Sequence, residues 1–122
     1  MKNKSFKAKA KFGWVKVNGD KYKKDIIIHS DGKVTKRKKK LSKDLKETYG
    51  HTPLSERELD FLPQEQFDAL YVGIGHNSAL PITPQADEIL KKYNAVVAST
   101  PEIIDRLEQE NNKFVAIIHV TC

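Results

Sequence analysis

The residue types best suited to binding or catalysis lie at the ends of three apolar segments in the second half of the chain. One segment ends at Gly75 and is followed by His76, the second ends at Ser99-Thr100, and the third ends at His119-Val120-Thr121-Cys122. In open parallel sheets, ligands bind beyond the carboxyl ends of the strands. If these segments are parallel strands, a cleft at their ends gathers backbone N–H groups, hydroxyls, an imidazole and a thiol. The candidate ligand-binding residues are Gly73, Gly75, His76, Ser78, Thr100 and Cys122.

The Gly73-Ile74-Gly75 turn invites comparison with a phosphate-binding loop, because glycines after a strand let N–H groups approach an anion. The dinucleotide-binding fingerprint requires Gly or Ala where this chain has Ser78. The next helix signal, Thr83-Pro84, comes too late for the helix to open directly out of the turn. No Gly-Lys-Ser/Thr pattern occurs either. We therefore expect no nucleotide cofactor, whereas a small-anion site and a tight turn needed only for packing both stay open.

A metal site and a catalytic nucleophile have less support in the sequence. A zinc site needs three or four convergent ligands, and His119 and Cys122 are three apart on a predicted strand, where their side chains point to opposite faces. Cys122 could act as a nucleophile only with a lowered pKa and a nearby base. No Ser-His-Asp elbow and no paired-carboxylate pattern stands out. We assign no metal site and no catalytic residue, and a non-enzymatic role is favoured over an enzymatic one.

Charge is distributed unevenly along the chain. Residues 1–50 hold 17 Lys and Arg against 5 Asp and Glu, a balance of +12, and residues 51–122 hold 5 against 11, a balance of −6. The basic run Lys36, Arg37, Lys38, Lys39, Lys40 could bind nucleic-acid phosphates without sequence preference. Single-strand readers interleave aromatic residues with the basic ones, and none lies between Lys33 and Lys46. A solvated edge strand, where lysines block sheet-to-sheet pairing, is the alternative.

The first half of the chain reads as antiparallel strands. Apolar and lysine residues alternate from Phe6 to Trp14, a period of two that predicts a strand with a bend or bulge at Gly13. Asn18-Gly19 predicts a hairpin turn, with 22–29 as the return strand. A second turn at Asp31-Gly32 leads to a third strand over 33–38.

The second half alternates buried strands with helices. Residues 67–75, 95–99 and 114–120 are predicted buried strands, and Thr83-Pro84 and Thr100-Pro101 each supply an N-cap and an N1 proline. Ser55 and Glu58 form a capping-box pattern, which predicts a short helix over 55–62. Because two helices connect the three strands, the strands should run parallel.

Length and composition indicate one domain, 1–122, large enough to bury a core. Cys122 is the one cysteine, which excludes an internal disulfide and favours a reducing compartment. No apolar run is long enough to span a membrane, and the lysine-rich start has no secretory signal. We expect a cytoplasmic protein without a membrane partner.

Several motifs in order resemble the Mth-nine-three-eight-like domain family over about residues 9–122. They are Phe12-Gly13, Asp31-Gly32-Lys33-Val34, His51 before a helix, Gly73-Ile74-Gly75, Ala79-Leu80 and the terminal His119-Val120-Thr121-Cys122. Eukaryotic relatives include an adipogenesis-associated protein and a mitochondrial assembly factor of respiratory complex I. Some relatives carry Arg in the glycine turn, where this chain has Ile74 and His76. The targeting segments of the complex I relatives have no counterpart here, so their mitochondrial role is not transferred.

The resemblance implies an α/β fold with three layers, β/β/α: an antiparallel N-terminal sheet, a mainly parallel C-terminal sheet and covering helices. It implies no catalytic residue and no cofactor. Three hypotheses follow. The favoured one is a non-catalytic protein-interaction or assembly module with an unidentified protein partner. The alternatives are a ligand-binding or enzymatic site around Gly75 and Cys122, and nonspecific nucleic-acid binding through Lys36–Lys40.

Overall fold

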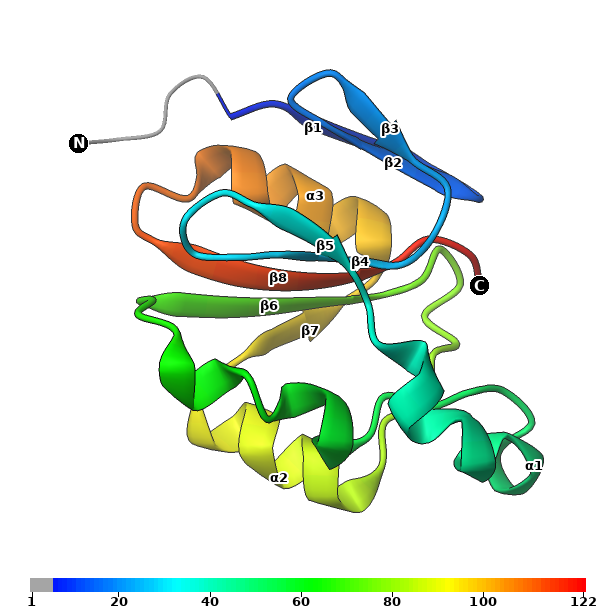
Figure 1. Cartoon of the computed structure of the whole chain (residues 1–122). Coiled ribbons are helices and arrows are strands. Elements are labelled where there is room, and N and C mark those ends of the chain that lie inside the picture. Colours follow the sequence, from blue (N-terminus) through cyan, green and yellow to red (C-terminus); the bar gives the residue numbers. More distant parts are fainter. Residues whose placement is uncertain (1–5) are drawn as a thin grey trace.

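The computed structural model describes residues 6–122, so the first five residues of the predicted domain lie outside it. Two sheets are present (Figure 1). The small sheet is antiparallel and has the order β1 (Ala8–Lys11), β2 (Trp14–Val17), β3 (Asp20–Tyr22). The large sheet has the order β5 (Val34–Lys36), β4 (Ile26–Ile28), β8 (Phe114–His119), β6 (Ala69–Ile74), β7 (Val96–Ala98).

The helices cover both faces of the large sheet, which gives the expected α/β fold. The long helices are α2 (Pro84–Lys92) and α3 (Thr100–Gln109). The short ones are α1 (Lys46–Tyr49) and the 3-10 helices η1 (Lys39–Leu45), η2 (Glu56–Leu59) and η3 (Leu62–Gln64). In Figure 1, α3 and the small sheet lie above the large sheet, and α2 lies below it. No helix within residues 6–122 has the length and apolar character needed to cross a bilayer.

Each interlayer space holds its own apolar core. Val15 and Val17 of the small sheet and Ile103 and Leu107 of α3 pack on one face of the large sheet. On the other face, side chains of α2, of the 3-10 helices and of the segment before η2 meet the opposite side of the same strands; they are Leu54, Leu59, Leu62, Ala86 and Leu90. A sheet covered on both faces needs strands that are apolar throughout. This explains the uninterrupted apolar sequence of β6 and β8.

The small sheet corrects one prediction and confirms another. Gly13 does not bend a single strand: Phe12-Gly13 is the two-residue turn between β1 and β2, with Lys11 paired to Trp14. Gly13 has φ +93°, a left-handed conformation that glycine adopts without steric cost. The Asn18-Gly19 hairpin is confirmed, with both residues at positive φ as a type I′ turn requires.

The return strand predicted over 22–29 was wrong in extent. The strand that follows the hairpin, β3, ends at Tyr22, and Ile26–Ile28 belongs to the large sheet as β4. All three isoleucines are buried. A strand with one wet face alternates apolar and polar residues, so three consecutive isoleucines fit only a strand covered on both faces.

The predicted parallel strands are confirmed, since β6 pairs in parallel with both β7 and β8. The sheet is mixed because β4 joins β8 and β5 in antiparallel pairing. The strand β7 lies at an edge, where Val97 is 39% exposed, so its predicted burial was wrong. Helix α2 begins as predicted, with Thr83 Oγ1 accepting the Ala86 N–H. Helix α3 is capped by Ser99, one residue before the predicted Thr100.

Candidate functional site

The predicted strand-end cleft is a tightly bonded junction between β6, α3 and the segment after β8. The Gly75 N–H donates to Thr100 Oγ1 at 2.9 Å, and the Thr100 hydroxyl donates to the His119 carbonyl at 2.6 Å. The Thr100 N–H donates to the Gly75 carbonyl at 3.0 Å. Thr100 is fully buried. Because Ser99 caps α3, the Thr100 hydroxyl is left to join the two strand ends.

The donors of the glycine turn are bonded to the chain's own last residues. The His76 N–H donates to the Thr121 carbonyl at 2.8 Å, and the Asn77 and Ala79 N–H groups donate to the Cys122 carbonyl at 3.1 and 2.9 Å. Gly75 has φ +99°, and a Cβ there would collide with the Cys122 carbonyl group. A small anion could bind these N–H groups only if residues 121–122 moved away. The geometry matches that of a glycine needed for close packing.

The other predicted cleft residues surround this junction. Gly73 packs on Thr100, where an added Cβ would lie 3.0 Å from Oγ1. Ser78 is exposed, at φ +54°. The half-buried His76 ring meets Phe12 edge-on with centroids 5.8 Å apart, and its two ring nitrogens have no hydrogen-bond partner among residues 6–122. The Cys122 thiol is free and half-buried.

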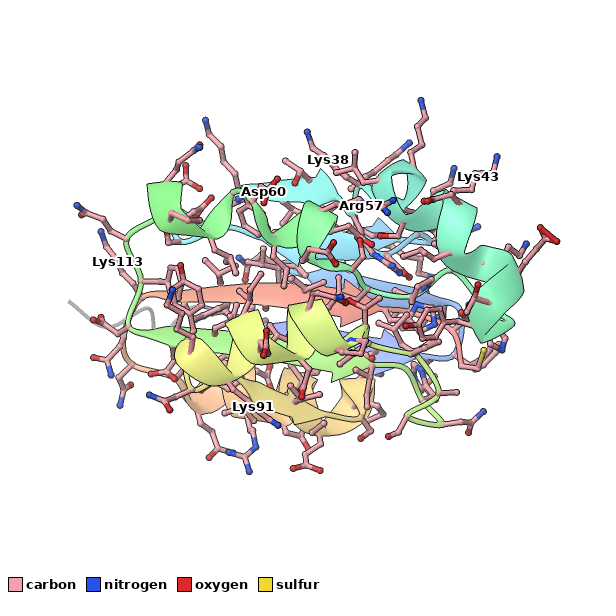
Figure 2. The ribbon with its side chains drawn as sticks, turned by 90° about the horizontal axis from the view of Figure 1, so that it is seen from below. Lys38, Lys43, Arg57, Asp60, Lys91 and Lys113 are labelled. Carbon is pink, nitrogen blue, oxygen red and sulfur yellow. The ribbon has the colours of Figure 1, made fainter. Side chains whose placement is uncertain are left out.

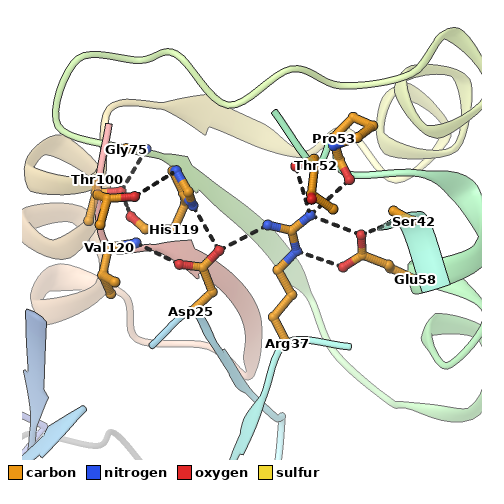
Figure 3. A network of polar contacts seen from close by, with 11 residues as sticks. Asp25, Arg37, Ser42, Thr52, Pro53, Glu58, Gly75, Thr100, His119 and Val120 are labelled. Carbon is orange, nitrogen blue, oxygen red and sulfur yellow. Dashed lines mark hydrogen bonds and ion pairs between the residues drawn. The ribbon is translucent and has the colours of Figure 1, made fainter. Parts of the chain in front are cut away.

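Next to the junction lies a buried ionic network that sequence reasoning missed (Figure 3). Asp25 Oδ2 accepts from Arg37 Nη1 at 2.9 Å and from His119 Nδ1 at 2.7 Å, and Oδ1 accepts the Val120 N–H at 2.9 Å. Burial alone would raise the pKa of Asp25, but the bonds from His119 and Val120 and the Arg37 charge lower it to about 2. Asp25 is therefore an ionised carboxylate.

Arg37 is the centre of this network. Its Nε and Nη2 donate to the two carboxylate oxygens of Glu58 at 2.7 and 2.9 Å, and Nη2 also donates to the Pro53 carbonyl at 2.8 Å. The Arg37 side chain is 1% exposed. Burial acts to lower its pKa, and the paired carboxylates of Glu58 and Asp25 raise it overall. Arg37 thus differs from the four exposed lysines of the basic run, because its charge is paired and out of reach of a phosphate.

The predicted capping box was wrong. A 3-10 helix does begin after Ser55, but Ser55 makes no side-chain cap bond. Its hydroxyl instead bonds to that of Ser42 at 2.6 Å, and Ser42 donates to Glu58 at 2.5 Å. Glu58 turns inward because Arg37 offers it two charged donors, a stronger interaction than one helix-end N–H. The available sequence signals were an arginine among lysines and an aspartate directly before three isoleucines.

A groove of about 1350 Å³ opens beside the network, between the β4–β5 edge and η1–η2. Its basic rim, as we call it, consists of Lys23, Lys24, Lys36, Lys38, Lys39 and Lys40. Its apolar lining is Ile27, Leu41, Phe61 and Val120. Figure 2 shows Lys38, Arg57 and Asp60 on this side of the molecule and Lys91 on the opposite side. The lysines of the predicted patch thus border a groove lined with apolar side chains.

Comparisons with known proteins place the chain by its structure. No protein-family model matches, and no curated protein is similar. The conserved hypothetical protein PH1505 from Pyrococcus horikoshii OT3 has a TM-score of 0.81 at 32% identity, covering 93% of this chain and 97% of its own. The protein MT938 has a TM-score of 0.78 at 34% identity, and the match covers 97% of this chain and 100% of MT938. A Bordetella parapertussis protein shares the fold alone, at 17% identity and a TM-score of 0.51. The match covers 94% of this chain and 95% of that protein.

The two sheets and their covering helices thus form a small α/β domain of the type seen in MT938 and PH1505. The chain belongs to the Mth-nine-three-eight-like domain family, as its motifs predicted. Since PH1505 is described as hypothetical, membership brings a fold and no assigned activity.

Proposed function

We propose that the protein is an interaction module whose groove binds an acidic, amphipathic segment of a partner protein. The observation that supports this most is the combination of six lysines at the rim with an apolar lining in one groove of about 1350 Å³. A lysine rim attracts carboxylates over long distances. An apolar lining gives such a partner a surface on which to bury its own apolar side chains.

The positive charge of the basic rim is not neutralised by the acidic side chains that line the groove. The carboxylates of Asp25 and Glu58 lie at the groove, but both are paired with Arg37, and Asp25 is also bonded to His119. Asp60 is one acidic side chain of the lining outside this network, and Arg57 is paired with Asp44. The groove therefore presents a net positive field, and a partner with negative charge fits it.

The lining favours apolar side chains over nucleic-acid bases. Leu41 is 43% exposed, a large apolar surface left to solvent at the groove. Proteins that bind single strands stack bases on aromatic side chains. Among the described residues of the lining, Phe61 is the one phenyl, tyrosyl or indole ring, and it already packs edge-on with His29 at a centroid distance of 5.5 Å. An amphipathic helix with leucines along one face can pack on the exposed side chain of Leu41, whereas Ile27 and Val120 line the groove as buried side chains.

The test is fluorescence anisotropy with a labelled Glu-rich peptide that carries leucines at i, i+3, i+4 and i+7. We expect Lys38→Glu/Lys40→Glu to weaken binding about tenfold or more, because like charges then face each other. Lys16→Glu/Lys92→Glu is the matched control, since it changes the net charge equally at exposed positions outside the groove lining. Leu41→Ser should also weaken binding of this peptide.

Two comparison ligands separate the alternatives. A peptide with serines in place of the leucines should bind more weakly, and a labelled oligo(U) should bind more weakly still. Absence of peptide binding at about 50 mM salt, where surface attractions are still strong, would overturn the proposal. So would equal losses in the groove and control variants. Tighter binding of oligo(U), lost in Lys38→Glu/Lys40→Glu, would assign the groove to nucleic acid instead.

A further inference from the structure

Three side chains in and beside the groove stand in the order of a nucleophile, a base and an orienting carboxylate. The Thr121 hydroxyl lies 3.3 Å from Nε2 of His119. The other ring nitrogen of His119, Nδ1, lies 2.7 Å from Asp25 Oδ2. Nucleophilic hydrolases on unrelated folds share this arrangement, which is recognised by geometry and roles and not by the order of residues in the chain.

Proton positions in this array follow from Asp25. An ionised carboxylate only accepts hydrogen bonds, so Nδ1 of His119 carries a proton. In the neutral imidazole, Nε2 then has a free lone pair, and it faces the Thr121 hydroxyl. Asp25 is itself held by Arg37 and by the Val120 N–H. The position of the Asp25 carboxylate therefore does not depend on His119, and the carboxylate can fix the orientation of the His119 ring.

Access to the array differs from one member to the next. Thr121 is half-buried and lines the groove, as Asp25 does. His119 does not line it and is 8% exposed. A molecule in the groove can thus reach the hydroxyl, while the base behind it is shielded from water. If the His119–Asp25 pair were purely structural, only Nδ1 of His119 would need a partner, and Nε2 would not have to face the Thr121 hydroxyl.

We propose that Thr121, His119 and Asp25 form an acyl-transfer site, and that its substrates are carboxylic esters bearing an anionic group. The Thr121 oxygen attacks the ester carbonyl carbon, and its proton passes to His119 Nε2. The bond to the leaving alcohol breaks, and that oxygen takes the proton from His119. Water then attacks the acyl-threonine with the same base, which releases the carboxylic acid and restores the hydroxyl. The basic rim holds the anionic group of the substrate.

In this site Thr121 and His119 are catalytic residues, and Asp25 is a positioning residue. The inference goes beyond binding of a partner segment. The two proposals share the basic rim, but the reacting residues Thr121 and His119 have no part in the peptide-binding proposal. The acyl-transfer site is therefore tested with an uncharged probe, which has no need of the lysines.

The experiment is covalent labelling by an uncharged alkyl fluorophosphonate carrying a reporter tag. An activated hydroxyl displaces fluoride from phosphorus, and the proton goes to the neighbouring base. We expect a stoichiometric adduct that peptide mapping locates on Thr121. Thr121→Val and His119→Asn should abolish labelling, and Thr121→Ser should retain it. Thermal unfolding of each variant checks that the fold is retained.

The role of Asp25 is tested by a measurement that would not change if its carboxylate only stabilised the fold. In Asp25→Asn, the rate of labelling at saturating probe should fall while the probe concentration for half-maximal rate stays unchanged, because the carboxylate no longer holds the His119 ring toward Thr121. Absence of labelling in folded wild-type protein would overturn the site, and so would labelling that persists in Thr121→Val. Either result would leave the peptide-binding proposal standing, because that proposal depends on the rim and on Leu41.

Discussion

Replacing Arg37 with methionine tests the buried network directly. Arg37 donates two hydrogen bonds to Glu58, one to Asp25 and one to the Pro53 carbonyl, all within 2.9 Å. Methionine has similar length and removes every one of them. Asp25 keeps the bonds from His119 and Val120, whereas Glu58 keeps only that from Ser42. The main consequence is thus a buried carboxylate without a counter-charge.

The size of the effect follows from the burial of Glu58, whose side chain is 2% exposed. Breaking a buried ion pair by removing one partner costs about 3–5 kcal/mol, since the remaining charge is left in a poorly solvated site. A domain of this size has about 5–15 kcal/mol in total. We therefore expect Arg37→Met to fold with most of its stability lost. The double variant Arg37→Met/Glu58→Gln should recover part of the loss, because it also removes the orphaned charge.

The assay is equilibrium unfolding in urea, followed by the fluorescence of Trp14, the one tryptophan of the chain. Lys38→Met is the matched control, because the neighbouring side chain is exposed and should matter by less than about 0.5 kcal/mol. The m value should be unchanged in all variants. If Arg37→Met is less than about 1 kcal/mol below the wild type, or is indistinguishable from Lys38→Met, the buried-network reasoning is refuted.

Three further predictions concern the packing and the titrating groups. Gly75→Ala should cost about 1–3 kcal/mol more than Gly32→Ala, because both have positive φ but only Gly75 is packed against Cys122; equal losses in urea unfolding would contradict the contact. Asp25, whose pKa falls from 3.8 to about 2 on folding, should contribute about 2 kcal/mol that is fully present above its unfolded pKa and lost as pH falls to about 2. Urea unfolding along that pH range should show the loss, and a flat profile would refute it. Burial, together with the bond to Glu110, raises the pKa of Tyr71 to about 12, so ultraviolet titration should show one late tyrosine that disappears in Tyr71→Phe, and its stabilising effect should vanish as pH rises through about 12.

Local patterns predicted most of the elements correctly because their physical causes are local. Asn18-Gly19 fixes a tight turn through its backbone preferences, and Thr83-Pro84 starts α2 through a cap and a fixed φ. The apolar runs of β6 and β8 predicted a sheet covered on both faces. Where a pattern admitted two structures, prediction went wrong: the same alternation from Phe6 to Trp14 fits one bent strand or a hairpin around Gly13.

The sites depended on contacts between distant parts of the chain. The glycine turn could be identified as a special backbone position, but its hydrogen-bond partners are residues 121 and 122. Ser55 and Glu58 fit a local capping box, and a residue 21 positions away, Arg37, instead draws Glu58 inward. Asp25 and His119, 94 positions apart, carry no local sign of their pairing.

The α/β class and the parallel direction of β6, β7 and β8 could be predicted from local patterns, because backbone preferences and the period of apolar residues act over a few neighbouring positions. The family was predicted from a resemblance in short motifs, and the similarity to MT938 confirms it. Which charges are buried and which stay in water depends instead on contacts between distant parts of the chain. In the basic run, Arg37 lies inside and the lysines lie outside, because the fold brings Glu58 and Asp25 to the one side chain whose planar guanidinium can bind both. Charge pairing of this kind depends on distance in space, which a run of like residues does not encode.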